Sequence, residues 1–219
     1  MKKLLILIFL ITLIIGLTSL YFYLQNQTKN REAEQTKTLL AEINENISLM
    51  DAVKDEMPKE LLDVHEYLMS GALGNKIYKI DPKFAGTVMY HDAKTQSIFI
   101  NTDIELPKEL WIPVFYHEVA HIYWHTKHPA ETEDQFQSQL FDSENYAYTV
   151  NAEAWDLVMK HYPVKETDLK NQLSKQLFKN YSQESDLYNA MVSGDQTAVL
   201  YWNKIIEAGI KQQKLLSGE

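Results

Sequence analysis

The chain contains no cysteine, and its 219 residues include only seven glycines and six prolines. The absence of cysteine excludes disulfide bonds, a cysteine-ligated zinc site and anchoring through a lipidated cysteine. So few glycines and prolines leave little room for disordered linkers. Positive charge is also scarce: a formal net charge of −9 argues against nucleic acid as a partner and against additional binding to anionic lipid.

Charged residues are missing altogether from Leu4 to Leu24, a run that follows Lys2 and Lys3. Its length suits one membrane-spanning helix and exceeds that of a usual signal-peptide core. We therefore expect residues 1–24 to form an uncleaved transmembrane signal anchor, with a cleaved signal peptide as the alternative. Because the two lysines favour a cytoplasmic amino terminus, we expect a single-pass membrane protein whose remaining residues lie outside the cytoplasm.

The segment His117-Glu118-Val119-Ala120-His121 carries the strongest chemical signal in the chain. Its surroundings are apolar and predict a buried helix, with Pro113 in the first turn. Histidines four positions apart lie on one helical face, so both imidazoles can reach a single ion, and Glu118 is placed beside a metal-bound water. This pattern is typical of zinc-dependent peptide hydrolysis. The alternative is a core helix whose histidines are merely hydrogen-bonded.

A catalytic zinc site needs a third protein ligand. The metzincin pattern would continue with glycine and histidine where this chain has Trp124 and Lys127, so the third ligand is expected to be a glutamate on a following helix. That helix is predicted from Ser143 onward, with Ser143 as its N-cap. Glu144 would then lie in the first turn, where carboxylates are common because they complement the helix dipole. Glu153 lies mid-helix between two alanines that permit close approach, so we favour Glu153 over Glu144.

The histidine motif followed by Glu153-Ala154 resembles the gluzincin pattern, and the most similar group is the ImmA/IrrE-like metallopeptidase domain. In that group a strand ending in Ile-x-Ile-Asn precedes the zinc helix, a histidine closes the helix, and the Glu-Ala helix ends near a proline. The counterparts in this chain are Ser97-Ile-Phe-Ile-Asn101, His125 and Pro163. Two features depart from the family: the N-terminal hydrophobic segment, and Trp155 where related peptidases often have Asp or Asn.

The resemblance implies a zinc metallopeptidase in which His117, His121 and Glu153 hold Zn²⁺ and Glu118 is the general base for a zinc-activated water. The expected partner is a peptide or protein substrate, of unspecified sequence. The alternative is a zincin-fold metal-binding or regulatory module without significant turnover, although the presence of Glu118 favours the enzyme. A third possibility is a tethered structural protein that binds no metal.

Further roles in catalysis stay open at this point. Five residues are unranked candidates for the group that steadies the oxyanion: Tyr148, His161, Tyr162, His125 and His91. Asp156 is considered as a partner that orients one of the zinc histidines. By resemblance, the strand Ser97–Asn101 is expected to lie beside the cleft and pair with an extended peptide.

The remaining pattern predicts a mainly helical α+β fold: a zincin-like domain with a small three-stranded sheet, preceded by one transmembrane helix. An amphipathic helix is expected from Leu40 to Met57, ended by Pro58. Short strands are expected at 76–80, 86–91 and 96–101, the last two as a hairpin. Other expected elements are helix 59–70, a loop or surface helix over 126–139, and helices near 167–181, 185–193 and 195–216.

The expected organisation has four parts. Residues 1–24 form the transmembrane signal anchor, and residues 25–74 form a juxtamembrane linker followed by helices. Residues 75–163 form the zincin-like catalytic core, and residues 164–219 form a C-terminal helical part.

Overall fold

The computed structural model describes residues 41, 43–74, 76–79, 87–101 and 103–217. The predicted signal anchor, residues 1–24, and the linker that follows it lie outside these ranges. Within the described ranges, no helix combines the length and the apolar character needed to cross a bilayer. The residues of Ile43–Glu219 form one compact unit.

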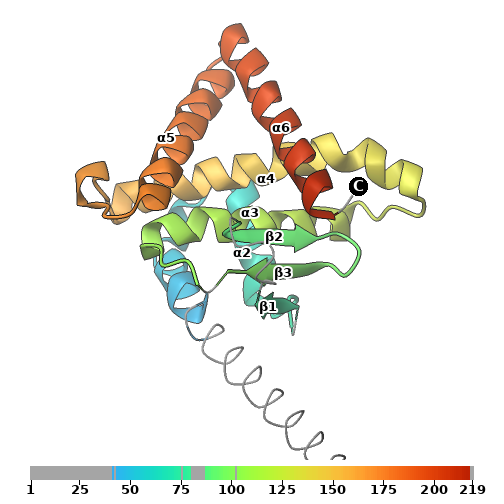
Figure 1. Cartoon of the computed structure of the whole chain (residues 1–219), viewed down its shortest axis with the longest axis horizontal. Helices are drawn as coiled ribbons and strands as arrows, with labels where there is room; N and C mark the ends of the chain where they lie inside the picture. The colour runs from blue at the N-terminus through green and yellow to red at the C-terminus, as the bar shows by residue number, and fades with distance from the viewer. Residues whose placement is uncertain (1–40, 42, 75, 80–86, 102, 218–219) are drawn as a thin grey trace, which may run out of the picture. The chain divides into compact units, whose positions relative to one another are not determined.

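This unit is a mainly helical α+β fold with one small sheet, as the sequence predicts. Helices α3 (Lys108–Lys127) and α4 (Glu133–His161) run side by side and make the most extensive contact between elements, and α2 (Lys59–Met69) packs against both. Helices α5 (Gln172–Val192) and α6 (Gln196–Ser217) form an inverted V above α4, as Figure 1 shows. Residues 43–51 are also helical, within the stretch where the amphipathic helix is expected, and two short 3₁₀ turns lie at Lys54–Glu56 and Glu166–Asp168.

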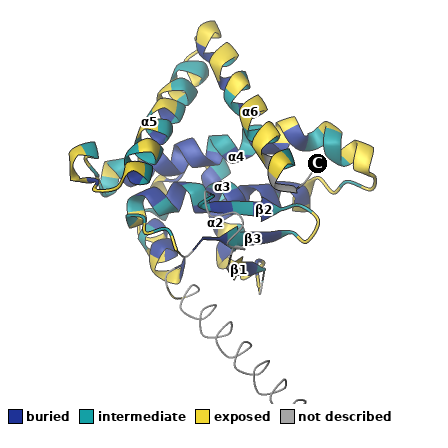
Figure 2. Cartoon of the chain, viewed as in Figure 1, coloured by how far each residue is buried: buried dark blue, intermediate teal, exposed yellow. Residues whose placement is uncertain are grey.

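The core lies where α3 and α4 meet. Both helices are buried over most of their middle length, whereas the apex of the α5–α6 pair is exposed (Figure 2). Twelve of the 20 residues of α3 are buried, and they occupy all sides of the helix. A helix that is covered all round places its polar side chains inside the protein, where they need specific partners.

The sheet consists of β1 (Ile77–Lys79), β2 (Met89–Asp92) and β3 (Ser97–Ile100) in the order β1-β3-β2. Strands β2 and β3 are antiparallel, with Tyr90 opposite Phe99, which confirms the predicted hairpin. Strand β1 pairs with β3 in parallel. Since β3 has a partner on each side, its backbone cannot add a further strand, and the expectation that Ser97–Asn101 pairs with a peptide is wrong.

Helix α3 begins five residues earlier than predicted, so Pro113 lies inside the helix and not in its first turn. Pro107 is the N-cap, and Leu110 and Ile112 are already buried before the proline is reached. A proline at this depth removes one backbone hydrogen bond. The burial of the surrounding apolar face outweighs that local cost.

Helix α4 is one continuous element of 29 residues where the sequence predicted a surface segment and a separate helix from Ser143. Its N-cap is Thr132, whose side chain accepts a hydrogen bond from the backbone of Gln135 at 3.2 Å.

Helix α5 is also one continuous element where the sequence predicts two helices, near 167–181 and 185–193. It is unbroken between Tyr181 and Ser185, because both residues are buried on one face of the helix.

Candidate metal centre

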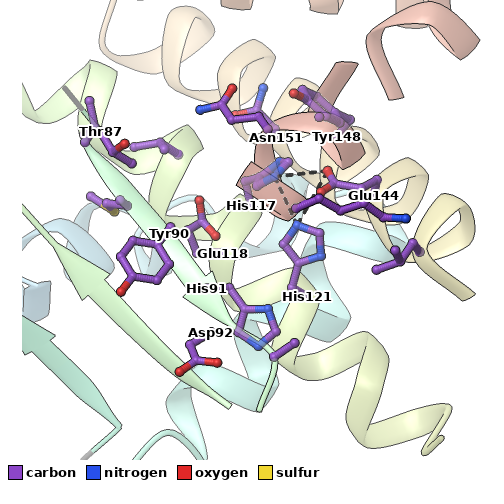
Figure 3. A pocket seen from close by; sticks show the side chains of 18 of the residues that line it. Thr87, Tyr90, His91, Asp92, His117, Glu118, His121, Glu144, Tyr148 and Asn151 are labelled. Carbon is purple, nitrogen blue, oxygen red and sulfur yellow. Dashed lines mark hydrogen bonds and ion pairs between the residues drawn. The ribbon is translucent and has the colours of Figure 1, made fainter. Parts of the chain in front are cut away.

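Helix α3 brings the three polar residues of the motif to one pocket. His117, Glu118 and His121 all line a cavity of about 680 Å³ bounded by α3, α4, α5, α6 and strand β2. The two histidine rings lie nearly perpendicular to each other, and their Nε2 atoms are 3.2 Å apart. The spacing of four residues therefore has the consequence predicted for it, because both imidazoles point at the same place (Figure 3).

The third group at this place is Glu144 of α4. Its Oε2 atom lies 3.7 Å from Nε2 of His117 and 3.7 Å from Nε2 of His121. Among the described residues, these three form the group of side chains whose donor atoms are close enough together to hold a metal ion. The site thus joins two helices whose contact is the largest in the fold.

The donor geometry and chemistry fit a zinc ion. Donor atoms bound tetrahedrally at zinc distances lie about 3.3 Å from one another, close to the three separations observed. The Oε2 atom of Glu144 is buried and makes no hydrogen bond with any described residue. Burial lowers the pKa of His117 to about 4 and that of His121 well below its usual value, so both rings are neutral, as metal binding requires.

Neighbouring groups fix the orientation of both histidines. Nδ1 of His121 lies 2.9 Å from the hydroxyl of Ser143, which also lies 3.3 Å from Nε2 of His125. The backbone of Ala147 lies beside the ring of His117. The contact with Ser143 occupies the nitrogen of His121 that faces away from the centre, and the Nε2 atoms of both rings are directed into it.

Glu118 lies beside the centre and is 7 % exposed. The backbone of His91 on β2 lies near its carboxylate, at the point where the motif helix faces the sheet. Burial, and secondarily the nearby carboxyl of Glu144, raise the pKa of Glu118 to about 8. Glu118 is not one of the grouped donors, in agreement with its predicted role as a neighbour of the ligands.

The structure does not bring Glu153 to the two histidines, contrary to the prediction. Its carboxylate accepts hydrogen bonds from the backbone N–H of Leu61 at 3.1 Å and from the hydroxyl of Tyr188 at 3.0 Å. Glu144 and Glu153 are nine residues apart, which is about two and a half helical turns, so they point to opposite sides of α4. One side faces α3 and the centre, and the other side faces α2 and α5.

The start of α4 explains why the sequence favours Glu153 over Glu144. A helix starting at Ser143 would place Glu144 in the first turn, whereas α4 starts at Glu133 and places Glu144 mid-helix. The signal for the earlier start was in the sequence: Thr132 followed three residues later by Gln135 is a capping-box pattern, and the Oε1 atom of Gln135 accepts from the backbone of Glu131 at 2.8 Å.

Of the five candidates for an oxyanion-stabilising group, two line the pocket and three do not. Tyr148 and His91 line the pocket, and the Tyr148 ring packs edge-on against His117 with centroids 4.7 Å apart. The ring of His91 stacks against those of His121 and His125, and Nε2 of His125 lies 3.3 Å from the hydroxyl of Ser143.

The other polar candidates serve the scaffold. His161 pairs with Glu56 at 3.2 Å, and the hydroxyl of Tyr162 donates to the carbonyl of Leu49. Asp156 does not orient a metal histidine, because its carboxylate accepts hydrogen bonds from Ser185 and Asn189 and so connects α4 to α5.

A comparison with protein-family models, curated proteins and solved structures found no match. The likeness to the ImmA/IrrE-like metallopeptidase domain therefore rests on residues of this chain alone. The geometry establishes a group of two histidines and one glutamate at metal-binding distances, with His121 and Glu144 buried and His117 half-buried, next to the buried Glu118 in a common pocket.

Proposed function

We propose that this protein is a zinc metallopeptidase that is anchored to a membrane by its N-terminal hydrophobic segment. The observation that carries the proposal is the convergence of His117, His121 and Glu144 in the pocket that also contains Glu118. A structural metal site is closed by protein groups, whereas a catalytic one has fewer protein ligands and access to a pocket. Three ligands at the wall of a large cavity fit the second description.

Zn²⁺ held by His117, His121 and Glu144 would supply a water of lowered pKa and polarise the carbonyl of the scissile peptide bond. Glu118 would accept a proton from that water on its carboxylate and return it to the leaving amine. Burial raises the pKa of Glu118, which makes its carboxylate a better proton acceptor than a solvent-exposed one. Glu118 lines the pocket, where such a water would lie.

Strand β2 is the element best placed to bind an extended peptide. It is paired on one side by β3, and residues 87–94 line the pocket beside Glu118. No strand of the described residues pairs with β2 on the side away from β3. A peptide added on that side would gain backbone hydrogen bonds and pass in front of the centre. This role replaces the one expected for the neighbouring strand.

The direct test compares wild type with Glu118→Gln in zinc content and in hydrolysis of an unstructured protein. We expect both chains to bind one zinc ion, while the substitution slows hydrolysis by about 10²- to 10⁴-fold because the general base is lost. Glu207→Gln on the exposed face of α6 is the matched control and should hydrolyse at the wild-type rate.

Two other outcomes of this comparison would contradict the proposed hydrolysis. Bound zinc with equal and negligible hydrolysis in both chains would support a metal-binding or regulatory module. Absence of zinc from the purified wild type would leave a tethered structural protein.

The membrane anchor is tested by a separate experiment. It asks whether the full chain stays with membranes after extraction at high salt and whether deletion of residues 1–24 releases it.

A further inference from the structure

A second polar group lies in the same pocket, away from the metal centre. Glu184 of α5 and Asn151 of α4 both line the cavity, together with Tyr181 one helical turn before Glu184. None of the three takes part in the proposed hydrolysis. The candidate mechanism therefore leaves a carboxylate, an amide and a phenol of this cavity without a role.

Among the described residues, Glu184 contacts an amide but forms no ion pair with a positively charged group. Its Oε2 atom accepts a hydrogen bond from Nδ2 of Asn151 at 2.9 Å. Within the described ranges of the chain, no lysine, arginine or histidine forms an ion pair with it. Burial raises the pKa of Glu184 to about 8, and the amide of Asn151 only partly offsets this effect. A carboxylate held at low dielectric without a counter-ion is costly, which is why such groups in proteins mostly have a cation partner.

The adjacent phenol points to a ligand as well. Tyr181 is 5 % exposed, and its hydroxyl makes no hydrogen bond with any described residue. Buried hydroxyls usually have a partner, since an unmade hydrogen bond inside a protein costs free energy. A donor group entering the cavity between Tyr181 and Glu184 would satisfy both.

The positions of Glu144 and Asn151 along α4 show how far this polar group lies from the metal centre. Asn151 follows Glu144 by seven residues and Tyr148 by three, so all three lie on one helical face (Figure 3). Seven residues of helix correspond to about 10 Å. An extended peptide advances about 3.3 Å per residue. A side chain within about three residues of the cleaved bond could therefore reach Glu184.

We infer that Glu184, held by Asn151 and flanked by Tyr181, forms a subsite for the cationic side chain of a lysine or arginine close to the cleaved bond. This inference rests on the proposed peptidase function. An ammonium or guanidinium group supplies both the positive charge and the several N–H donors that the carboxylate and the phenol lack. The enzyme would thus prefer basic peptides.

The test uses the full chain in detergent and a series of neutral fluorogenic peptides. Each peptide carries one lysine at a successive position on either side of the cleaved bond, and its match carries norleucine there. We expect lysine at one position to raise kcat/KM at least 10-fold over norleucine. Glu184→Gln should reduce this ratio to within about 2-fold, and Asp186→Asn, an exposed carboxylate on the same helix, should leave the ratio intact. Thermal unfolding of each variant reports whether its fold is retained.

Binding to the Glu118→Gln chain separates the subsite from catalysis. A lysine peptide that binds this chain at least 10-fold more tightly than its norleucine match, and loses the advantage with Glu184→Gln, supports the subsite even if wild type cleaves nothing. Cleavage by wild type without lysine preference at any position overturns the subsite and leaves the proposed function standing. A preference that disappears when the peptide amino terminus is acetylated would also overturn it, by assigning the cation to the α-amino group.

Discussion

At the scale of single residues, the choice between Glu144 and Glu153 decides what the centre can bind. Glu144 has a buried oxygen that accepts no hydrogen bond from the part of the chain that the structure describes, whereas the two oxygens of Glu153 accept from Leu61 and Tyr188. A carboxylate without donors is available to a metal ion, and one that accepts two hydrogen bonds serves the packing of α2 and α5 on α4. Residue identity and helical location alone do not separate the two.

We expect Glu144→Gln to weaken zinc binding by more than about 100-fold, because removal of a direct ligand should exceed the 10- to 100-fold effect of losing an outer partner. Glu153→Gln should leave zinc affinity within a few-fold of wild type, since the glutamine oxygen can still accept from the backbone of Leu61 while its amide group donates to the hydroxyl oxygen of Tyr188. Competition with a chromophoric chelator measures both affinities. Strong zinc loss in Glu153→Gln and unchanged binding in Glu144→Gln would contradict the assignment.

At the scale of elements, helix α6 completes the wall of the centre. Its buried face carries Ala198, Trp202 and Ile206 at steps of four residues, and Trp202 donates from Nε1 to Asn145 of α4 at 2.7 Å. The same face then reaches Gly209, which lies against α4 at the height of the metal ligands. A Cβ at this position would lie 3.0 Å from Oε2 of Glu144 and 2.9 Å from Cε2 of Tyr148.

Gly209→Ala should therefore disturb the centre although the helix propensity of alanine is higher. The added methyl must push back Tyr148 or lift the end of α6, and over-packing of this kind costs about 1–3 kcal/mol. We expect a lower free energy of unfolding and weaker zinc binding, measured by chemical denaturation and chelator competition. Ala208→Gly, at the neighbouring exposed position, reports the propensity effect alone. Stabilisation by Gly209→Ala with unchanged zinc affinity would show that α6 does not press on the centre.

The elements also show where sequence patterns were informative. The hairpin of β2 and β3 follows from strand alternation around a short polar turn, and its strands lie at 89–92 and 97–100 where the sequence predicts 86–91 and 96–101. The order of the strands in the sheet does not follow from such local patterns, because the parallel pairing of Ile77 with Ile98 joins segments that are distant in the chain. That pairing makes β3 central and leaves β2 as the strand beside the pocket.

At the scale of the whole molecule, the described unit buries an unusual set of ionisable groups around one cavity. Burial raises the pKa of Glu118, Glu144 and Glu184 to about 8, in the first case with help from a neighbouring carboxyl. Burial lowers the pKa of His117 and His125 to about 4. The two sets act on stability in opposite directions as pH changes.

The carboxyls hold their protons more tightly in the folded chain, so their contribution to stability is complete below a pH near 4.5 and is lost as pH rises through about 8. The histidines bind fewer protons when folded, and their contribution is complete above a pH near 6.5. Above that pH only the carboxyl effect remains. We therefore expect the melting temperature of the metal-free protein to fall between pH 6.5 and pH 8.5, measured by thermal unfolding with a chelator present.

Zinc should reverse this trend, because a bound cation favours the ionised form of Glu144 and the neutral forms of both histidines. The stabilisation by saturating zinc should accordingly be greater at pH 8.5 than at pH 6.5. A metal-free protein that becomes more stable over this interval would mean that the carboxyls of the cavity are ionised in the folded state.

The sequence by itself determined the part of the centre that is local. His117, Glu118 and His121 share one turn of a helix, and helical geometry alone places the two imidazoles together with the glutamate beside them. The helical content and the three strands were likewise encoded in short-range patterns of apolar residues.

Only the tertiary structure decided which carboxylate completes the group and which strand borders the pocket. Glu144 and Glu153 lie on opposite sides of the same helix, and which side faces the histidines depends on how α4 packs on α3. That packing is set by the burial of many apolar side chains from distant parts of the chain, and no local pattern contains it.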